Sequence, residues 1–189
     1  MDYINTNLGF YDNKIVVEDT GSDWNGFEVM MDWEHPMMSS SAAYITQNGG
    51  DILEIGFGMG ISAGYIQSHS INSHTIVENH PQIIPKAVEW ASNKSNVTIV
   101  SQSWYDVKDS IGTFNGVFYD TWDDDNWLNF SSSLNGLTKN GAKVTFYNKC
   151  QSETNDLNIL NCQYEQISVT TDENKYFDGG VYYMPKKEF

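Results

Sequence analysis

Residues 49–62 read Gly49-Gly50-Asp51-Ile52-Leu53-Glu54-Ile55-Gly56-Phe57-Gly58-Met59-Gly60-Ile61-Ser62, an apolar strand that runs into a glycine-dense turn. A segment with helical periodicity follows, and the chain returns as a second strand, His74-Thr75-Ile76-Val77-Glu78, which ends in an acid. Glycines let the backbone adopt positive φ and let a ligand approach main-chain N–H groups. A β–turn–α–β unit closed by a carboxylate is typical of a nucleotide-type site, in which Glu78 would bond the ribose hydroxyls.

The spacing of the glycines indicates which nucleotide is bound. Gly56, Gly58 and Gly60 form G-x-G-x-G, whereas a dinucleotide fingerprint needs its third glycine at the position of Ile61. No phosphate-binding lysine follows, which excludes a P-loop. The pattern favours a donor such as S-adenosyl-L-methionine, which carries ribose and adenine but no phosphate. A tight turn without any ligand is the structural alternative.

Composition and charge narrow the class of protein. A chain of 189 residues suits a single domain with a substantial core. The net charge of −15 argues against a nucleic-acid partner and favours a cationic substrate or basic partner, although a solvated acidic surface explains it equally well. The first seven residues lack a signal peptide, and no apolar run reaches membrane-spanning length, so we expect a cytoplasmic protein without a membrane partner.

Alternating strand and helix patterns predict an α/β fold with a mostly parallel sheet and helices on both faces. Beyond the first two strands we expect a continuous strand at 97–100 covered on both faces, then strands at 116–119 and 142–147, and a final antiparallel pair at 164–171 and 180–185. We also expect helices near 36–45 and 154–160, one capped by Asn79, and one whose N-terminus is capped by the acids 123–125.

Ligands in such sheets bind beyond the carboxyl ends of the strands. This predicts one pocket lined by residues 56–60, Glu78, Trp104, Asp120 and Asn148. Trp104 would either stack on an adenine or cover the core. The three acids at 123–125 are better explained by a helix N-terminus than by a metal site, so we expect no metal.

Three motifs carry a resemblance to a known family. They are Val29-Met30-x-x-Trp33-Glu34-x-Pro36-x-Met38, Leu53-Glu54-x-Gly56-Phe57-Gly58-Met59 and Tyr119-Asp120-Thr121. In this order they resemble the guanidinoacetate N-methyltransferases and the related arginine δ-nitrogen methyltransferases, over roughly residues 26–148. The resemblance implies a Rossmann-like class I methyltransferase fold with a seven-stranded sheet. We expect a single domain over 1–189: an N-terminal lid and helix (1–48), a cofactor-binding core (49–148) and C-terminal strands (149–189).

The resemblance also implies the roles of individual residues. S-adenosyl-L-methionine, which leaves as S-adenosyl-L-homocysteine, would be held by Met30, Met38, Phe57, Gly58, Met59, Gly60, Ile61, Ser62, Glu78, Asn79, His80, Trp104, Tyr105 and Asp120. The acceptor would be held by Glu34, Asp120, Asn148, Lys149 and Cys150, with Asp120 and Glu34 as the catalytic acids. By position alone, Glu34 could equally be an acid that stabilises a helix N-terminus.

The chemistry explains why two acids are needed. A guanidinium has a pKa above about 12, and carboxylates can grip its planar fork bidentately. Asp120 would accept a proton as the new carbon–nitrogen bond forms. We therefore expect an S-adenosylmethionine-dependent N-methyltransferase that acts on a small cationic guanidino compound resembling guanidinoacetate, as a monomer or homodimer. The alternatives are a protein arginine N-methyltransferase, a silent binder of S-adenosylmethionine or its product, and, more distantly, a dinucleotide-dependent oxidoreductase.

The chain departs from the family's pattern in three places. The segment between the strand at 142–147 and the final pair is short, so one wall of the acceptor pocket would be missing or more open. The family's N-terminal tryptophan over the acceptor has no clear match, and Phe10, Tyr11 or Trp24 would replace it. Lys149 stands where the family carries an apolar residue, and it either pairs with a substrate carboxylate or points into solvent.

Overall fold

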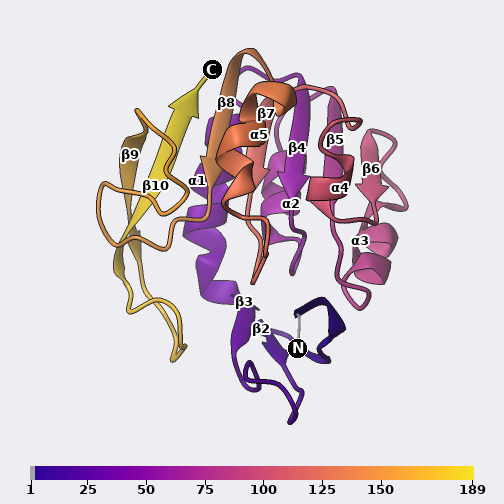
Figure 1. Ribbon diagram of the computed structural model, residues 1–189, viewed down its shortest axis with the longest axis vertical. Coiled ribbons are helices and arrows are strands. Elements are labelled where there is room, and N and C mark those ends of the chain that lie inside the picture. Colours follow the sequence, from indigo (N-terminus) through magenta and orange to yellow (C-terminus); the bar gives the residue numbers. More distant parts are fainter. Residues whose placement is uncertain (1–2) are drawn as a thin grey trace.

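The computed structural model describes residues 3–189, so Met1 and Asp2 of the predicted N-terminal segment lie outside the described residues. A seven-stranded sheet has the order β6-β5-β4-β7-β8-β10-β9 (Figure 1). Its strands are β4 (Asp51–Ile55), β5 (Ser73–Val77), β6 (Val97–Val100), β7 (Phe114–Tyr119), β8 (Thr138–Phe146), β9 (Gln163–Val169) and β10 (Gly180–Glu188).

The pairing of these strands confirms the expected mostly parallel sheet with an antiparallel C-terminal end. β4 pairs in parallel with β5 and β7, and the outer pairs β5–β6 and β7–β8 are also parallel. β10 runs antiparallel to both β8 and β9. The parallel strands therefore share one carboxyl edge, where an α/β sheet binds its ligands.

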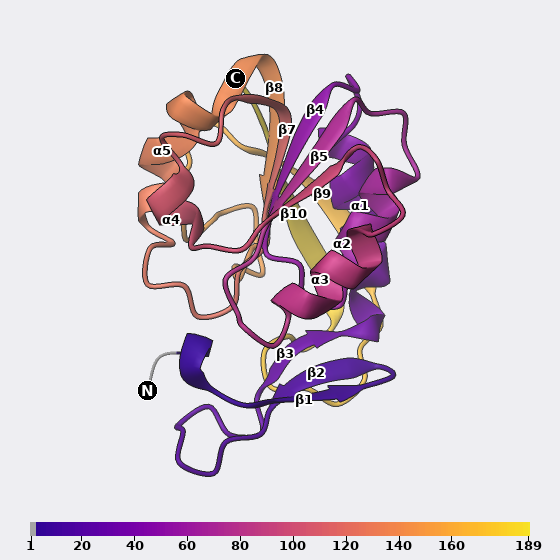
Figure 2. The same ribbon diagram turned by 90° about the vertical axis from the view of Figure 1, so that its right-hand side faces the viewer.

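Helices cover both faces of the sheet (Figure 2). α1 (His35–Ile45), α2 (Ile61–Gln67) and α3 (Ile84–Ala91) lie on one face, and α4 (Trp104–Val107) and α5 (Asn129–Leu137) lie on the other. Side chains alternate along a strand, so neighbours in β4 enter different cores. Ile52 packs into the core with α1, whereas Leu53 and Ile55 pack into the core with α4 and α5. Within residues 3–189, every helix is too short or too polar to traverse a bilayer.

A second, three-stranded sheet lies beyond the carboxyl edge (Figures 1 and 2). It consists of β1 (Leu8–Tyr11), β2 (Lys14–Val17) and β3 (Glu28–Met31), and the short helix η1 (Tyr3–Asn5) precedes it. β3 passes through the 3₁₀ turn η2 (Asp32–Glu34) directly into α1. This connection brings Glu34 to the carboxyl edge of the main sheet.

Several predictions about local structure were wrong. β6 is an edge strand and only half-buried, because nothing pairs with its outer side among the described residues. Residues 154–160 form turns rather than a helix. The helix after β5 begins at Ile84, not after Asn79, and it has a proline in its first turn.

The acids 123–125 do not cap a helix, because α5 begins only at Asn129. Asp124 instead accepts hydrogen bonds from the phenol of Tyr119 (2.7 Å) and from the backbone N–H of Asn126 (2.8 Å). Asp123 has a positive φ of 47°. The run is therefore an irregular loop whose shape is set by contacts with the end of β7.

Candidate active site

A cavity of about 430 Å³ opens at the carboxyl ends of β4, β5 and β7, between the main sheet and the N-terminal segment. Two carboxylates, Glu34 and Asp120, reach it from opposite parts of the chain. The glycine turn after β4 and the acid after β5 form another part of its wall. The structure therefore joins the three motifs that were separate in the sequence.

The glycine turn depends on backbone conformations that side chains disfavour. Gly56, Gly58 and Gly60 have φ values of 94°, 52° and 75°. A Cβ on Gly56 would lie 1.9 Å from the carbonyl oxygen of Asp120, so this position excludes a side chain. The turn and the end of β7 are packed backbone against backbone.

Glu78 organises the turn from the neighbouring strand. Its carboxylate accepts the backbone N–H groups of Phe57 (2.9 Å), Asn79 (2.9 Å) and His80 (2.8 Å). Burial raises the pKa of Glu78, and these hydrogen bonds act in the opposite direction. Glu78 also lines the cavity, which places its carboxylate where a donor such as a ribose hydroxyl could reach it.

Glu34 is a buried acid, 3% exposed, at the junction of η2 and α1. Its side chain makes no capping hydrogen bond to α1. One carboxylate oxygen accepts the backbone N–H of Met31 (2.8 Å) and the phenol of Tyr176 (2.6 Å). The Met31 bond completes a capping box at the N-terminus of η2, so Glu34 does serve a helix terminus. Its bond to Tyr176 and its place in the cavity lie outside that structural role.

Asp120 directly follows β7, and its backbone N–H donates to the carbonyl of Ile55 at 2.9 Å. Among residues 3–189, no hydrogen bond reaches its carboxylate. Burial, and then the charge of Glu54, raise its pKa to about 7. Burial, and then the charge of Asp120, raise the pKa of Glu34 to about 8. Two acids with raised pKa values in one cavity form a site suited to a cation.

The residues predicted to hold the methyl donor divide into two groups. Those that line the cavity are Met30, Phe57, Gly58, Ser62, Glu78, Asn79, Trp104 and Asp120. Those that do not line it are Met38, Met59, Gly60, Ile61, His80 and Tyr105.

The surroundings of three residues in the second group explain why they do not line the cavity. Met38 belongs to α1, is 1% exposed and points into the core under that helix. His80 is completely buried, and its ring packs 4.8 Å from that of Tyr3. Tyr105 is 37% exposed, with the Lys108 ammonium 5.0 Å from its ring centre. Trp104, by contrast, is 4% exposed and belongs to the core while lining the cavity. The expectation that it covers the core is confirmed, and its stacking on an adenine stays a prediction.

Of the predicted acceptor residues, Glu34, Asp120 and Lys149 line the cavity, whereas Asn148 and Cys150 do not. The amide of Asn148 donates to the carbonyls of Thr154 and Tyr183, both at 2.9 Å. It therefore fastens the C-terminal segment to the end of β8 instead of facing the cavity.

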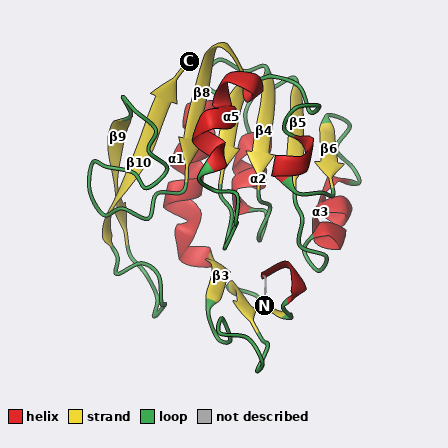
Figure 3. Cartoon of the chain, viewed as in Figure 1, coloured by secondary structure: helices red, strands yellow, loops and turns green. Residues whose placement is uncertain are grey.

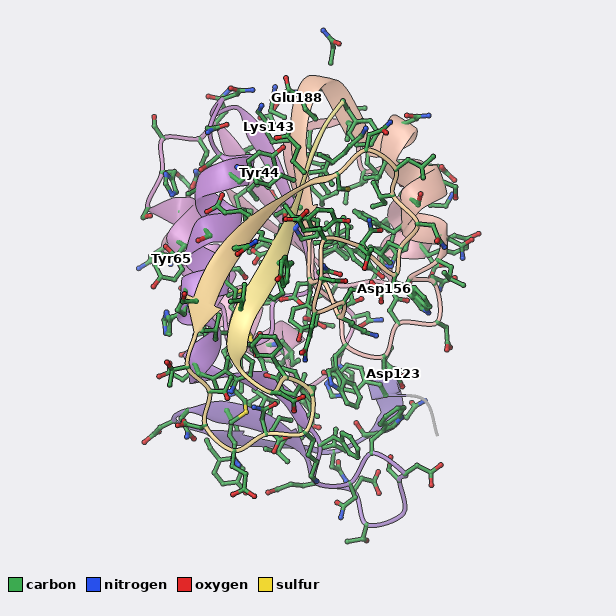
Figure 4. All side chains as sticks on the ribbon, turned by 90° about the vertical axis from the view of Figure 1, so that its left-hand side faces the viewer. Tyr44, Tyr65, Asp123, Lys143, Asp156 and Glu188 are labelled. Carbon is green, nitrogen blue, oxygen red and sulfur yellow. The ribbon has the colours of Figure 1, made fainter. Side chains whose placement is uncertain are left out.

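Lys149 is exposed, and its ammonium lies 5.8 Å from the ring centre of Trp127. It lines both the main cavity and a smaller one of about 200 Å³, which Asp123 and Asp156 also line. Figure 4 shows these two acids on the same side of the molecule, with Tyr65 on the opposite side. Lys149 makes no ion pair with any of the residues 3–189.

Sequence reasoning missed three tyrosines that line the cavity, and the first of them is Tyr3 in η1. Tyr147 follows β8 and projects into the cavity where Asn148 was expected, a difference of one residue that strand alternation could have decided. Tyr176 comes from the loop between β9 and β10, and nothing local in the sequence indicates its role. Of the three candidates for the missing N-terminal aromatic residue, Trp24 lines the cavity and Phe10 and Tyr11 do not.

The residues present fit a nucleoside-type methyl donor. The glycine turn, Glu78 and Trp104 line the same cavity, whose volume of about 430 Å³ exceeds that of a few water molecules. No group of three or more His, Cys, Asp or Glu residues within 3–189 is arranged to hold a metal ion.

Comparison with known proteins adds family and fold. Residues 11–178 match the family model described as guanidinoacetate N-methyltransferase. The protein arginine N-methyltransferase 2 of Kluyveromyces lactis is 29% identical over 220 residues, covering 99% of this chain and 53% of the relative. The protein of the same name from Aspergillus oryzae is 34% identical over 156 residues, covering 77% of this chain and 36% of the relative. The chain thus spans about half the length, or less, of these relatives.

Solved structures show the same fold at low sequence identity. Spermidine synthase from Thermotoga maritima superimposes with a TM-score of 0.65 at 12% identity, covering 96% of this chain and 72% of that chain. The N-methyltransferase NodS from Bradyrhizobium japonicum, in complex with S-adenosyl-L-homocysteine, gives a TM-score of 0.61 at 11% identity, covering 82% and 87%. These likenesses support the class I methyltransferase fold.

Proposed function

The chain belongs to the guanidinoacetate N-methyltransferase family, and from this premise we propose that it transfers a methyl group from S-adenosyl-L-methionine to a nitrogen of a guanidino compound. One observation carries the proposal: Glu34 and Asp120 line a single cavity together with the glycine turn and Glu78. A donor half and a cation-binding half in one cavity are what methyl transfer to a guanidinium requires.

The donor half would hold S-adenosylmethionine, which supplies an electrophilic methyl group when bound. The main chain of residues 56–58 would meet the donor, because these residues line the cavity. Glu78 would accept a ribose hydroxyl, because its carboxylate lines the cavity beside the turn. Trp104 offers an aromatic surface on the same side of the cavity.

The acceptor half would bind a guanidinium by charge and shape. The raised pKa values of Glu34 and Asp120 mean that the cavity by itself disfavours two negative charges. An entering cation compensates both charges and draws both acids into their ionised forms. Asp120 would then accept the proton that leaves the nitrogen as the carbon–nitrogen bond forms. Holding the reactants aligned supplies much of the acceleration, about 7–11 kcal/mol where alignment is good.

The leading acceptor is a small guanidino compound resembling guanidinoacetate. Lys149 supports it, because this cation lines the cavity and has no ion-pair partner among the described residues. A second candidate is an arginine side chain in a protein. The relatives named protein arginine N-methyltransferase 2 and the net charge of −15, which suits a basic partner, favour that candidate. A silent donor-binding protein would have no need for the two acids.

The test is methyl transfer from labelled S-adenosylmethionine to a panel of acceptors. The panel contains guanidinoacetate, free arginine, a guanidine without a carboxylate and an arginine-containing peptide. We expect transfer to a guanidino compound by the wild type and none by Asp120→Asn. Binding of the donor without transfer to any of the four acceptors would contradict the proposal.

A further inference from the structure

The two carboxylate oxygens of Glu34 have different surroundings. Oε1 accepts both the Met31 N–H (2.8 Å) and the Tyr176 phenol (2.6 Å). No residue within 3–189 donates a hydrogen bond to Oε2, although the side chain lines the cavity. Oε1 is therefore occupied by protein donors, and Oε2 remains for a ligand.

The ring of Tyr176 is held in place by its neighbours. It packs against Trp33, with ring centres 5.4 Å apart at 31°. The side-chain oxygen of Asn174 accepts the backbone N–H groups of Tyr176 (3.0 Å) and Phe177 (2.8 Å). Phe177 in turn stacks on Trp33 at 5.7 Å. The phenol is thus presented to Glu34 by a structured turn and an aromatic cluster.

The loop that carries Tyr176 is anchored on the N-terminal segment. The backbone N–H of Lys175 donates to Glu28 at 3.3 Å, and its ammonium donates to the carbonyl of Gly26 at 2.5 Å. Figure 3 shows this loop, between β9 and β10, reaching down beside β3. Glu34 and Tyr176 are 142 positions apart in the chain. Their hydrogen bond is therefore part of a larger interface between the β9–β10 loop and the N-terminal segment.

The hydrogen bond from Tyr176 affects the protonation of Glu34, because other charged groups surround this carboxylate. Burial and the charge of Asp120 raise its pKa, whereas the hydrogen bonds from Tyr176 and Met31 lower it. The titratable groups that face Glu34 from other elements are Asp120 after β7, Tyr147 after β8, Tyr176 in the β9–β10 loop and Tyr182 on β10. Asp32 and His35, its near neighbours in the chain, pair with each other at 3.0 Å on the surface.

We propose that Tyr176 is a positioning residue: its phenol holds Oε1 so that Glu34 meets the acceptor cation as an ionised carboxylate through Oε2 alone. The inference rests on the proposed function and deepens it. Asp120 differs, because no hydrogen bond from residues 3–189 engages its carboxylate and both of its oxygens stay available. Asp120 then binds the guanidinium of the acceptor with both carboxylate oxygens, and Glu34 binds it with one oxygen.

The experiment compares Tyr176→Phe with the wild type. We expect KM for the guanidino acceptor to rise about tenfold, as loss of a hydrogen bond to a charged group implies. In the pH profile of kcat/KM, the acidic limb should move to higher pH by about one unit, because Glu34 loses a hydrogen bond that favours its ionised form. One pH unit corresponds to a tenfold change in the proton equilibrium. Affinity for S-adenosylhomocysteine, measured by calorimetry, should stay unchanged, because the phenol contacts only the acceptor half.

A second measurement does not depend on activity. Carbon-13 NMR of protein labelled at the glutamate carboxyl carbon follows the titration of Glu34, with Glu34→Gln identifying its signal. The midpoint should rise in Tyr176→Phe and stay unchanged in Tyr164→Phe. Tyr164 lies on β9 of the same hairpin as Tyr176, and its phenol accepts a hydrogen bond from the amide of Asn155, away from Glu34. An unchanged midpoint in Tyr176→Phe would overturn the proposal, as would equal losses of donor and acceptor affinity. Wild type that methylates no guanidino compound would refute the proposed function alone, because the NMR titration still reports on Tyr176.

Discussion

The carboxylate of Glu78 accepts the backbone N–H of Phe57 at 2.9 Å, which fastens the end of β5 to the glycine turn after β4. Phe57 is the first residue of the turn after Gly56, and it is 4% exposed. Glu78 therefore shapes the main-chain surface that a donor would meet, in addition to offering its own oxygen. Because Glu78 has both roles, its substitution tests the donor half of the cavity directly.

Replacing Glu78 by Gln should weaken donor binding. The amide keeps one acceptor oxygen but turns an N–H₂ group toward backbone donors, so at least one main-chain bond is lost. We expect the Kd for S-adenosylhomocysteine to rise about tenfold or more by calorimetry. Glu89→Gln, on the exposed side of α3, is the matched control. Unchanged donor affinity in Glu78→Gln would count against both roles.

Asp120→Asn should abolish methyl transfer while leaving donor affinity nearly intact. Asparagine has a similar shape but cannot accept the departing proton, and general-base catalysis contributes about 10²–10⁴-fold to a rate. The measurement is single-turnover transfer from labelled donor, with calorimetry of S-adenosylhomocysteine beside it. If both quantities fell together, Asp120 would belong to the donor half and the assigned role would be wrong.

The stability of the protein without ligands should fall as pH rises through the titration of Glu34. An unfolded glutamate has a pKa of about 4.3, whereas folding raises that of Glu34 to about 8. Between these values the folded chain retains a proton that the unfolded chain has released, so its free energy of unfolding decreases with pH.

Glu34→Gln removes this penalty, so its Tm relative to wild type should be higher at pH 8 than at pH 5. We expect a difference of about 2 °C or more, measured by calorimetry without donor or acceptor. Glu89→Gln should show no such dependence on pH. The same Tm difference at both pH values would mean that Glu34 is already ionised at pH 5.

Two glycines eight residues apart should respond in opposite ways to alanine. At Gly56 the φ of 94° and the Asp120 carbonyl oxygen, 1.9 Å from the position that a Cβ would take, leave no room for a methyl group. At Gly64, inside α2, nothing lies within 4 Å of such a Cβ. We expect Gly56→Ala to lower Tm and abolish donor binding, and Gly64→Ala to stabilise α2 by up to about 1 kcal/mol. Thermal unfolding of both variants measures the two changes in Tm. Equal changes in Tm would contradict the close packing of the glycine turn.

Much of the fold and the donor half could be predicted because their signals are local. A glycine at Gly56 or Gly60 reports a backbone conformation set by its immediate neighbours. Apolar runs such as residues 51–55 report a strand buried on both faces. The errors arose where long-range contacts decide: the strand at 97–100 has the composition of a strand covered on both faces, yet it is only half-buried at the edge of the sheet. The acids at 123–125 have the composition of a helix cap, yet Asp124 bonds to Tyr119.

The amino-acid sequence alone determined the order of the elements, the glycine turn and the acids that follow strands β5 and β7, because each depends on residues adjacent in the chain. Only the tertiary structure decided that Glu34 meets Asp120, that Tyr147 and not Asn148 lines the cavity, and that Tyr176 donates to Glu34. These contacts join residues up to 142 positions apart. Such contacts form because packing the N-terminal segment, the sheet edge and the C-terminal loop together buries their apolar side chains, and no local pattern encodes which polar groups then become neighbours.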